Sequence, residues 1–288
     1  MADPKRTRPG NSSGDFFVDE TCIDCDTCRW VARDLFTRVG DGSAVTRQPA
    51  TAEERRRSFL AMRACPTASI GCTGDKTGLK DADFPLKLDD KLYYLGYASE
   101  KSFGAAAYLL VRPGGNVMID SPRFHEPLAK AIAALGPVKW LVLTHRDDVA
   151  DHAQWAARLG CQRVLHQGDI SGDTQGVEIQ VQGLGRMELA PGLVFVPVPG
   201  HTRGHGVLCA DERYLFTGDH LEFDEDEQSL RAFKDFCWFD WKEQIKSMQR
   251  ILDLKFEWVL PGHGRMKHAS KEQMSAWLLD CVQWMQRP

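Results

Sequence analysis

Side chains that can bind a metal ion gather in four short segments of this sequence. The segments begin at Thr144, Pro199, Thr217 and Pro261, and each follows an apolar run that is typical of a buried strand. Histidine binds metals through a neutral ring nitrogen, and aspartate binds them through an anionic oxygen. Since the ends of several strands can converge on one point, the pattern predicts metal-dependent chemistry at a shared site.

A second group of metal-binding side chains lies near the start of the chain. Cys22, Cys25 and Cys28 follow one another at intervals of three, and Cys65 comes much later, directly before Pro66. This arrangement, over about residues 16–72, resembles the bacterial ferredoxins, in which three cysteines and a remote Cys-Pro hold an iron–sulfur cluster. The resemblance implies one 4Fe–4S cluster, and a 3Fe–4S form is not distinguished from it. The alternatives are four unrelated thiols or a structural zinc site, although zinc sites usually show two paired cysteine knuckles.

Composition narrows the classes of function. The chain has 288 residues, of which 43% are hydrophobic and 26% charged, with a net charge of −4. These values predict a globular protein with no general attraction to nucleic acid or to anionic membranes. We see no secretory signal and no apolar stretch of the roughly 18 residues that a membrane span needs. The nine cysteines are an odd number and four of them suit reduced thiolates, so we expect a cytoplasmic protein.

The motifs fall into two predicted domains. We expect a disordered tail over residues 1–15, a ferredoxin-like domain over 16–78 that includes a helix at 52–64, and a larger domain over 79–288. The boundary near residue 78 rests on a stretch rich in Gly, Lys and Asp at 73–90. In the larger domain strands occur in two groups, with helices between and after them. That order predicts two sheets packed face to face with helices outside.

From about residue 90 to the end, the chain resembles the metallo-β-lactamase superfamily. The resemblance rests on the four segments and on the run from Gly115 to Asp120. It implies an αββα sandwich, in the α+β or α/β class, with a small ferredoxin-like domain ahead of it. In that family a Thr-His-x-His-x-Asp-His loop and three later residues bind two metals. The resemblance assigns these ligand positions to His145, Asp151, His152, His201, Asp219 and His263, with Asp219 as the bridging ligand.

The first segment departs from the family pattern. The family has three residues between the first histidine and the aspartate, whereas this chain has five, at 146–150, and lacks the second histidine. Either Asp147 or Asp148 could replace that imidazole. A carboxylate in place of a nitrogen ligand favours Fe or Mn relative to Zn. The sequence leaves open two metals, one metal held by Asp151, His152, Asp219 and His263, or no metal.

Three further side chains stand close to these segments. His205 follows His201 by four residues, and we interpret it either as a supporting contact or as a turn histidine. Trp238 and Trp241 precede the last segment and could cover a pocket there. Core or helix-face positions are the commoner use of tryptophan, so this interpretation competes with a structural one.

The resemblance implies a hydrolase in which a metal-bound hydroxide attacks an ester, thioester, lactone or phosphodiester of a small molecule. Asp151 would then bind a metal and accept a hydrogen bond from the hydroxide, which makes it the candidate catalytic residue. The alternative is an iron-dependent oxidoreductase, in which the ferredoxin-like domain takes electrons from a redox partner protein and delivers them to the second metal site. A third hypothesis is a non-catalytic electron carrier with a degenerate sandwich. The expected cofactors are one 4Fe–4S cluster and one or two divalent metals, Zn or Fe, with Mn as a further candidate.

Overall fold

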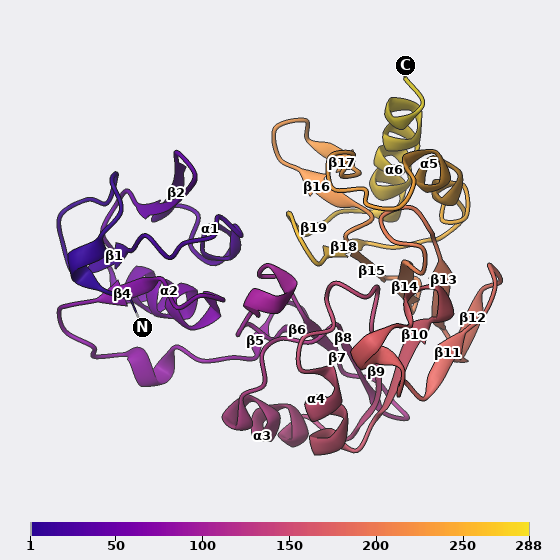
Figure 1. Cartoon of the computed structure of the whole chain (residues 1–288), viewed down its shortest axis with the longest axis horizontal. Coiled ribbons are helices and arrows are strands. Elements are labelled where there is room, and N and C mark those ends of the chain that lie inside the picture. The colour runs from indigo at the N-terminus through magenta and orange to yellow at the C-terminus, as the bar shows by residue number, and fades with distance from the viewer. Residues whose placement is uncertain (1, 288) are drawn as a thin grey trace. The chain divides into compact units, whose positions relative to one another are not determined.

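The computed structural model describes residues 2–287 and divides the chain into two compact units (Figure 1). The first unit comprises the chain up to Pro113 together with Pro122–Pro137, and the second comprises Gly114–Ser121 and the chain from Val138 onward. The first unit thus extends beyond residue 78, where the sequence places a domain boundary. Within residues 2–287, none of the helices is both long and apolar enough to span a membrane.

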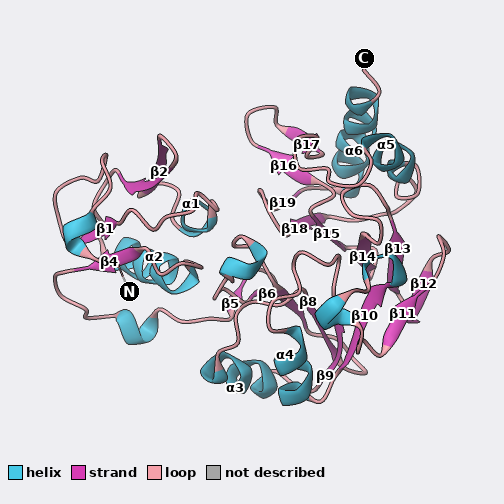
Figure 2. Ribbon diagram, viewed as in Figure 1, coloured by secondary structure: helices cyan, strands magenta, loops and turns pink. Residues whose placement is uncertain are grey.

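The first unit contains short strands and three α-helices (Figure 2). Its strands are β1 (Phe16–Val18), β2 (Phe36–Val39), β3 (Gly42–Val45), β4 (Ile70–Cys72), β5 (Leu86–Lys87), β6 (Leu92–Tyr94) and β7 (Tyr108–Leu110); its helices are α1 (Thr27–Val31), α2 (Ala52–Ala64) and α3 (Glu126–Ala134), with 3-10 turns η1 (Pro4–Arg6), η2 (Leu79–Asp81) and η3 (Glu100–Ser102). Helix α2 matches the predicted helix at 52–64. It begins with a capping box, in which Thr51 accepts a hydrogen bond from the Glu54 amide and the Glu54 side chain returns to the Thr51 amide.

The N-terminal segment is held by hydrogen bonds, although we expected a disordered tail over residues 1–15. The side-chain oxygen of Asn11 accepts hydrogen bonds from the amides of Val18 and Val45, at 2.9 and 3.0 Å. The Asn11 amide group donates to the carbonyl of Val18 at 2.9 Å. One side chain therefore ties this segment to both β1 and β3.

The second unit contains three α-helices and strands of three sheets, the smallest of which is the β16-β17 pair. Its strands are β8 (Asn116–Ile119), β9 (Val138–Val142), β10 (Gln162–His166), β11 (Ile179–Val181), β12 (Met187–Ala190), β13 (Leu193–Pro197), β14 (Gly206–Ala210), β15 (Tyr214–Gly218), β16 (Glu222–Asp224), β17 (Ser229–Arg231), β18 (Trp258–Pro261) and β19 (Lys267–His268); its helices are α4 (His152–Leu159), α5 (Trp241–Met248) and α6 (Lys271–Met285), with 3-10 turns η4 (Gln167–Asp169) and η5 (Gly172–Thr174). Strands β8 to β11 run parallel to their neighbours. The second sheet has the order β12-β13-β14-β15-β18-β19 and is antiparallel except between β15 and β18.

The sheet that contains β13, β14, β15 and β18 is apolar on both faces. Both faces are therefore buried inside the unit. Alternate residues such as Val196, Val207 and Leu215 pack with Met248 of α5 and Leu278 of α6. The residues between them in the sequence are equally buried and point to the opposite face, because strand side chains alternate. Helix α4 contacts β9 and β10 of the other sheet. In Figure 1 the two sheets lie between α4 on one side and α5 and α6 on the other, which is the predicted αββα order.

Parallel strand pairs set the position of the candidate site. In the first sheet β8 and β9 are parallel, with Ile119 beside Val142 near their ends. In the second sheet β15 and β18 are parallel, with Gly218 beside Pro261. Parallel neighbours end at the same edge of a sheet. The loops that follow β8 and β9 therefore begin side by side, and so do the loops that follow β15 and β18.

Candidate metal centre

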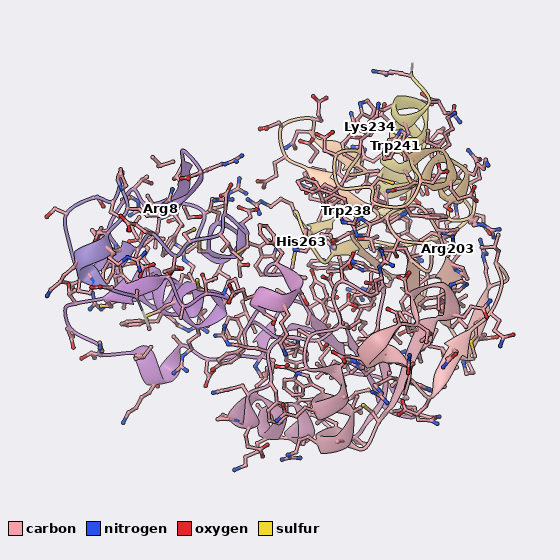
Figure 3. All side chains as sticks on the ribbon, viewed as in Figure 1. Arg8, Arg203, Lys234, Trp238, Trp241 and His263 are labelled. Carbon is pink, nitrogen blue, oxygen red and sulfur yellow. The ribbon has the colours of Figure 1, made fainter. Side chains whose placement is uncertain are left out.

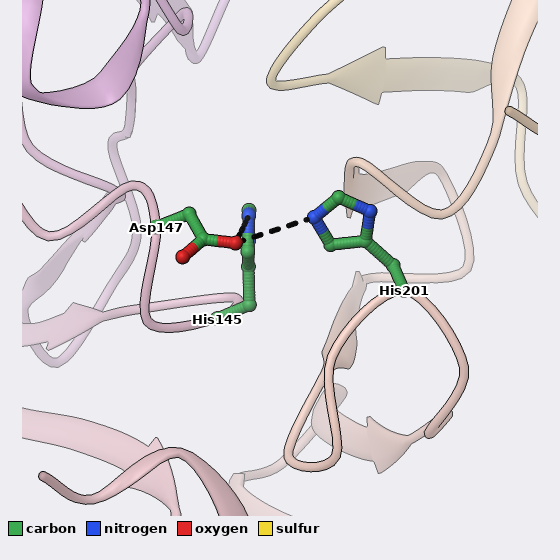
Figure 4. Close-up of side chains that lie close together, drawn as sticks. All are labelled: His145, Asp147 and His201. Carbon is green, nitrogen blue, oxygen red and sulfur yellow. Dashed lines mark ion pairs between the residues drawn. The ribbon is translucent and has the colours of Figure 1, made fainter. Parts of the chain in front are cut away.

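Three side chains from two segments form the first part of the site. His145 follows β9, and His201 lies in the loop after β13. The Oδ2 atom of Asp147 lies 3.9 Å from Nε2 of His145 and 3.6 Å from Nε2 of His201 (Figure 4). Ligand atoms around one metal sit roughly 3–4 Å apart when the bonds are about 2.0–2.2 Å. These three side chains therefore have the spacing of ligands to one ion.

Asp219, directly after β15, connects this group to a second one. Its Oδ2 atom lies 3.7 Å from Nε2 of both His145 and His201. On its other side Nδ1 of His263 lies 2.8 Å from Oδ1 of Asp219. Burial opposes ionisation of Asp219, but the adjacent His263, together with the other two histidines, holds the pKa of this carboxyl below its ordinary value.

Asp148 joins the second group. Its side chain is buried, and neither carboxylate oxygen has a hydrogen-bond partner among the described residues. Ligand atoms of His145, Asp148 and Asp219 all lie within 4.8 Å of one another. Gly262 leaves the space that these acids need, because a Cβ there would lie 2.6 Å from Oδ2 of Asp148 and 2.9 Å from Oδ1 of Asp219. Burial, and then the nearby Asp219, raise the pKa of Asp148 well above its ordinary value.

His145 is prepared to act as a neutral ligand. Burial lowers the pKa of His145 to about 4, so its imidazole is uncharged at neutral pH. The Nε2 atoms of His145 and His201 are buried and have no hydrogen-bond partner among residues 2–287. A buried polar atom without a partner is costly, and a cation among these atoms would satisfy both nitrogens and the oxygens of Asp148. The donor set therefore fits one or two divalent metals.

A buried acid orients the first histidine. Asp120 follows β8, and its Oδ1 accepts a hydrogen bond from the amide of Thr144 at 2.8 Å. The Thr144 hydroxyl lies 3.0 Å from Oδ2 of Asp120 and 3.0 Å from Nδ1 of His145. Burial raises the pKa of Asp120 to about 8. Because Nδ1 of His145 is engaged by this contact, Nε2 is the nitrogen that faces the candidate ligands.

Two supporting side chains lie among the ligand-bearing loops. The first is Asp169, which the sequence did not predict. Its carboxylate accepts hydrogen bonds from the amides of Arg146 at 3.1 Å and Gly204 at 2.8 Å, and it therefore links two loops. His205 accepts a hydrogen bond from the amide of Asp219 at 3.2 Å, and its ring stacks on His145 with centroids 4.8 Å apart. The spacing from His201 was the signal for His205, whereas nothing in the sequence pointed to Asp169.

Asp151 and His152 lie outside both groups of converging ligand atoms. His152 is the first residue of α4, and its Nδ1 lies 3.3 Å from a guanidinium nitrogen of Arg163. A histidine that faces a fixed cation is poorly placed to bind a second one. Asp151 precedes the helix in a left-handed conformation, with φ at 51°, and belongs to neither group. The structure thus brings Asp148, rather than Asp151 and His152, to Asp219.

The four motif cysteines of the first unit line one small cavity, and all four are free of disulfides. Backbone amides point at two of the sulfurs: Ser43 donates to Sγ of Cys22 at 3.4 Å, and Ser69 donates to Sγ of Cys65 at 3.3 Å. Such N–H···S contacts stabilise the negative charge of a bound cluster. Burial raises the pKa of Cys25 to about 11, so binding of a cluster would release its proton.

Gly104 allows the backbone to approach the cysteines closely. It has a φ of +90°, and a Cβ there would lie 2.9 Å from Sγ of Cys25. The hydroxyl of Thr27 donates to the Gly104 carbonyl at 3.1 Å and fixes the approach. Two acids of the cysteine loop are neutralised, since Arg29 forms ion pairs with both Asp24 and Asp26. The cavity is therefore lined by sulfur and free of an unpaired acid at these two positions.

Comparison with known proteins agrees with this arrangement. Residues 18–72 match the family described as the 4Fe-4S single cluster domain of Ferredoxin I. Residues 102–263 match the metallo-beta-lactamase superfamily, and the chain belongs to that superfamily. Both resemblances inferred from the motifs are confirmed.

Solved structures support the fold. The metallo-beta-lactamase FIM-1 from Pseudomonas aeruginosa, in a mono-zinc form, is 17% identical, with a TM-score of 0.51 over 72% of this chain and 98% of that one. The DIM-1 metallo-beta-lactamase is 16% identical, with a TM-score of 0.52 over 69% of this chain and 95% of that one. A curated relative, "Beta-lactamase-like protein 2 homolog" of Drosophila melanogaster, is 37% identical over 71 residues. That match covers 25% of this chain and about a fifth of the relative, at 21%.

Proposed function

We propose that this chain is a metal-dependent hydrolase of the metallo-β-lactamase superfamily with an attached iron–sulfur domain. The observation that carries the proposal is Asp148, a buried carboxylate whose two oxygens have no hydrogen-bond partner and which lies beside the acid Asp219. Two adjacent buried acids repel each other unless one of them is protonated, as the raised pKa of Asp148 indicates for the metal-free site, or a cation compensates them. A divalent metal supplies that compensation.

The proposed ligands fall into two sets that share one acid. His145, Asp147 and His201 form one set, and Asp148 and His263 form the other, with Asp219 between them. A metal bound there would activate a water molecule and polarise the bond to be cleaved. The role that the family motif gives to Asp151 passes to Asp148 in this proposal.

The chain's own residues leave a route for the substrate. Asp147 is the exposed member of the ligand set, with 45% of its side chain accessible, whereas His145 and His201 are almost fully buried. Water and substrate therefore reach the site from the side of Asp147. His205 and Asp169 hold the loops behind the ligands, so these groups move little when a substrate binds.

The donor set also bears on the identity of the metal. Three carboxylates and three imidazoles make a harder, more negative site than a set dominated by histidine. Such a set favours Fe or Mn over Zn. We therefore propose Fe or Mn as the resident metal, with Zn as the competing outcome of metal analysis.

A panel of small esters, thioesters, lactones and phosphodiesters tests the hydrolase proposal. We expect turnover of at least one class by the holoprotein and a loss of about 10³-fold or more in His201→Ala, together with loss of metal. His268→Ala, which changes an exposed histidine on β19, is the control and should keep full activity. Turnover that persists in His201→Ala would contradict the proposal.

Oxidoreduction is the second candidate, favoured by the cluster domain in the same chain and by the carboxylate-rich donor set. The redox reaction requires iron in the second unit and a partner protein that supplies electrons. The test is to reduce the protein and follow reoxidation of the cluster together with the spectrum of any second iron site. A second site that contains only zinc would exclude this candidate.

A further inference from the structure

An exposed aromatic loop lies beside the candidate metal centre. Between β17 and α5, Phe236 is 57% exposed, Trp238 is 61% exposed and Phe239 is 43% exposed. The rings of Phe236 and Trp238 are 6.0 Å apart, edge to face. Single exposed apolar side chains are common, but a group of large aromatic rings in contact usually marks a binding surface. We call these three residues the aromatic rim.

The rim is anchored to a proposed metal ligand. The amides of Trp238 and Phe239 both donate to the carbonyl of His201, each at 3.0 Å. The Trp238 ring lies 6.3 Å from the His201 imidazole, and Figure 3 shows Trp238 on the second unit. The thiol of Cys237 adds a contact of 3.1 Å to the carbonyl of Gly200. A molecule that reaches His201 therefore meets the rim next.

A cation borders the rim. The guanidinium of Arg203 lies over the ring of Phe239, 5.3 Å from its centroid, and forms no ion pair with an acid in the described part of the chain. Arg203 and Phe239 line an open cavity together with Leu184 and Pro199. An arginine that stacks on an aromatic ring keeps its N–H groups available for a carboxylate or phosphate.

The two acids that also line this cavity have other partners. Asp240 caps α5, and its Oδ1 accepts hydrogen bonds from the amides of Lys242 and Glu243, at 2.8 and 3.0 Å. The Glu243 carboxylate forms an ion pair with Lys246 at 3.1 Å. Neither acid forms an ion pair with Arg203, whose charge has no counterion in the described part of the chain.

We propose that the aromatic rim and Arg203 bind the part of the substrate that does not react, and that this part is an apolar group bearing a negative charge. The inference rests on the proposed hydrolase function and adds a substrate class to it. The rings of the rim cover an alkyl or aryl group, and Arg203 pairs with a nearby carboxylate or phosphate. Trp241, by contrast, is half-buried and packs against Trp284 of α6, so it belongs to the core.

Binding of simple probes to the full-length holoprotein tests the inference without turnover. Octanoate should bind about tenfold more tightly than butyrate, because the longer chain covers the rings, and more tightly than neutral octanamide. Trp238→Ala should weaken octanoate binding about tenfold, and Arg203→Gln should abolish the preference for octanoate over octanamide. Leu279→Ala is the control, since Leu279 is a 50% exposed apolar residue on α6.

The outcomes separate this inference from the hydrolase proposal. Equal binding of octanoate and butyrate, with turnover of any ester intact, overturns the substrate class and leaves hydrolysis standing. Tight octanoate binding that depends on Trp238, without turnover of any tested bond, supports the rim and overturns hydrolysis. A change in tryptophan fluorescence with phosphatidylglycerol vesicles but not with octanoate, absent in Trp238→Phe, overturns the inference in favour of a membrane surface. If Trp238→Ala does not fold, the affinity for octanoate is measured in Phe236→Ala and Trp238→Phe instead. These variants should show a weakening in the same direction.

Discussion

Asp219 and His263 are in direct contact. Nδ1 of His263 lies 2.8 Å from Oδ1 and 2.9 Å from Oδ2 of Asp219, and the His263 amide donates to Oδ1 at 3.2 Å. The contact joins the ends of β15 and β18, and it keeps an acid ionised in a buried place. The same acid lies close to Asp148, whose pKa is raised by burial and by this neighbour, and a cation bound there would compensate both carboxylates.

His152 provides a prediction that differs from the family pattern. Its ring contacts Arg163 instead of the candidate metal ligands, so His152→Ala should keep the metal content of the wild type. The lost contact and the small cavity should lower the free energy of unfolding by about 1–2 kcal/mol. Metal analysis and urea unfolding check both parts. His145→Ala, measured alongside, should lose metal, and a comparable loss in His152→Ala would show that the motif assignment was right after all.

His205 should act through the backbone of Asp219. His205→Phe removes the acceptor of the Asp219 amide and leaves that buried N–H without a partner. We expect metal affinity to fall about 10–100-fold, as is typical when a group that supports a ligand is lost. His205→Gln, which retains an acceptor oxygen, should recover part of the affinity. Titration with a divalent metal measures both variants, and an unchanged affinity in His205→Phe would count against a supporting role.

The lowered pKa of Glu178 predicts that the free energy of unfolding depends on pH. Hydrogen bonds from Arg163 hold the pKa of Glu178 at about 2, below its ordinary value of 4.5. A lowered pKa stabilises the fold above the ordinary value, and this contribution is lost as the pH falls from about 4.5 toward 2. Because the side chain is 40% exposed, solvent screening limits the effect to about 1 kcal/mol or less. The difference in unfolding free energy between wild type and Glu178→Gln should be constant from pH 5 to 8 and shrink below pH 4.5; a difference that grows with acidity would reverse the assigned sign.

Two cysteines of the first unit, one inside the proposed cluster site and one outside it, test the assignment of the fourth cluster ligand. Cys65 lines the sulfur cavity, whereas Cys72 does not and instead contacts the carbonyl of Asp75. Cys65→Ser should therefore lose the cluster absorbance and its iron, while Cys72→Ser should keep both. Visible spectra and iron content measure this directly. If the two variants retain equal amounts of cluster iron, the fourth ligand has been misassigned.

The sequence predicted the fold class and the cluster motif because both depend on local spacing. Cys22, Cys25 and Cys28 lie within one loop, and a Cys-Pro is a strong local signal. The ends of apolar runs likewise pointed to His145 and Asp219, which the structure brings together, although their role as ligands stays a prediction.

The rest of the site could not be found from local spacing. Two extra residues after His145 change which aspartate faces Asp219, and only the folded loop shows that it is Asp148. Asp169 lies in a short 3-10 turn and connects two loops that are distant in the sequence, so no periodic pattern marks it. The division into compact units also depends on contacts distant in sequence, which composition near residue 78 does not encode.

The metal content of anaerobically purified protein tests the central claim most directly, with acid-labile sulfide used to count the cluster. The account predicts one or two divalent metals per chain beyond the cluster iron, and fewer in Asp148→Asn. Without metal, the Asp148→Asn protein should be at least as stable as the metal-free wild type, because a buried ionisable group has been removed. Asp226→Asn, on an exposed loop, is the control and should match the wild type. Wild-type protein with no metal beyond the cluster iron, or Asp148→Asn with the full wild-type content, would contradict it.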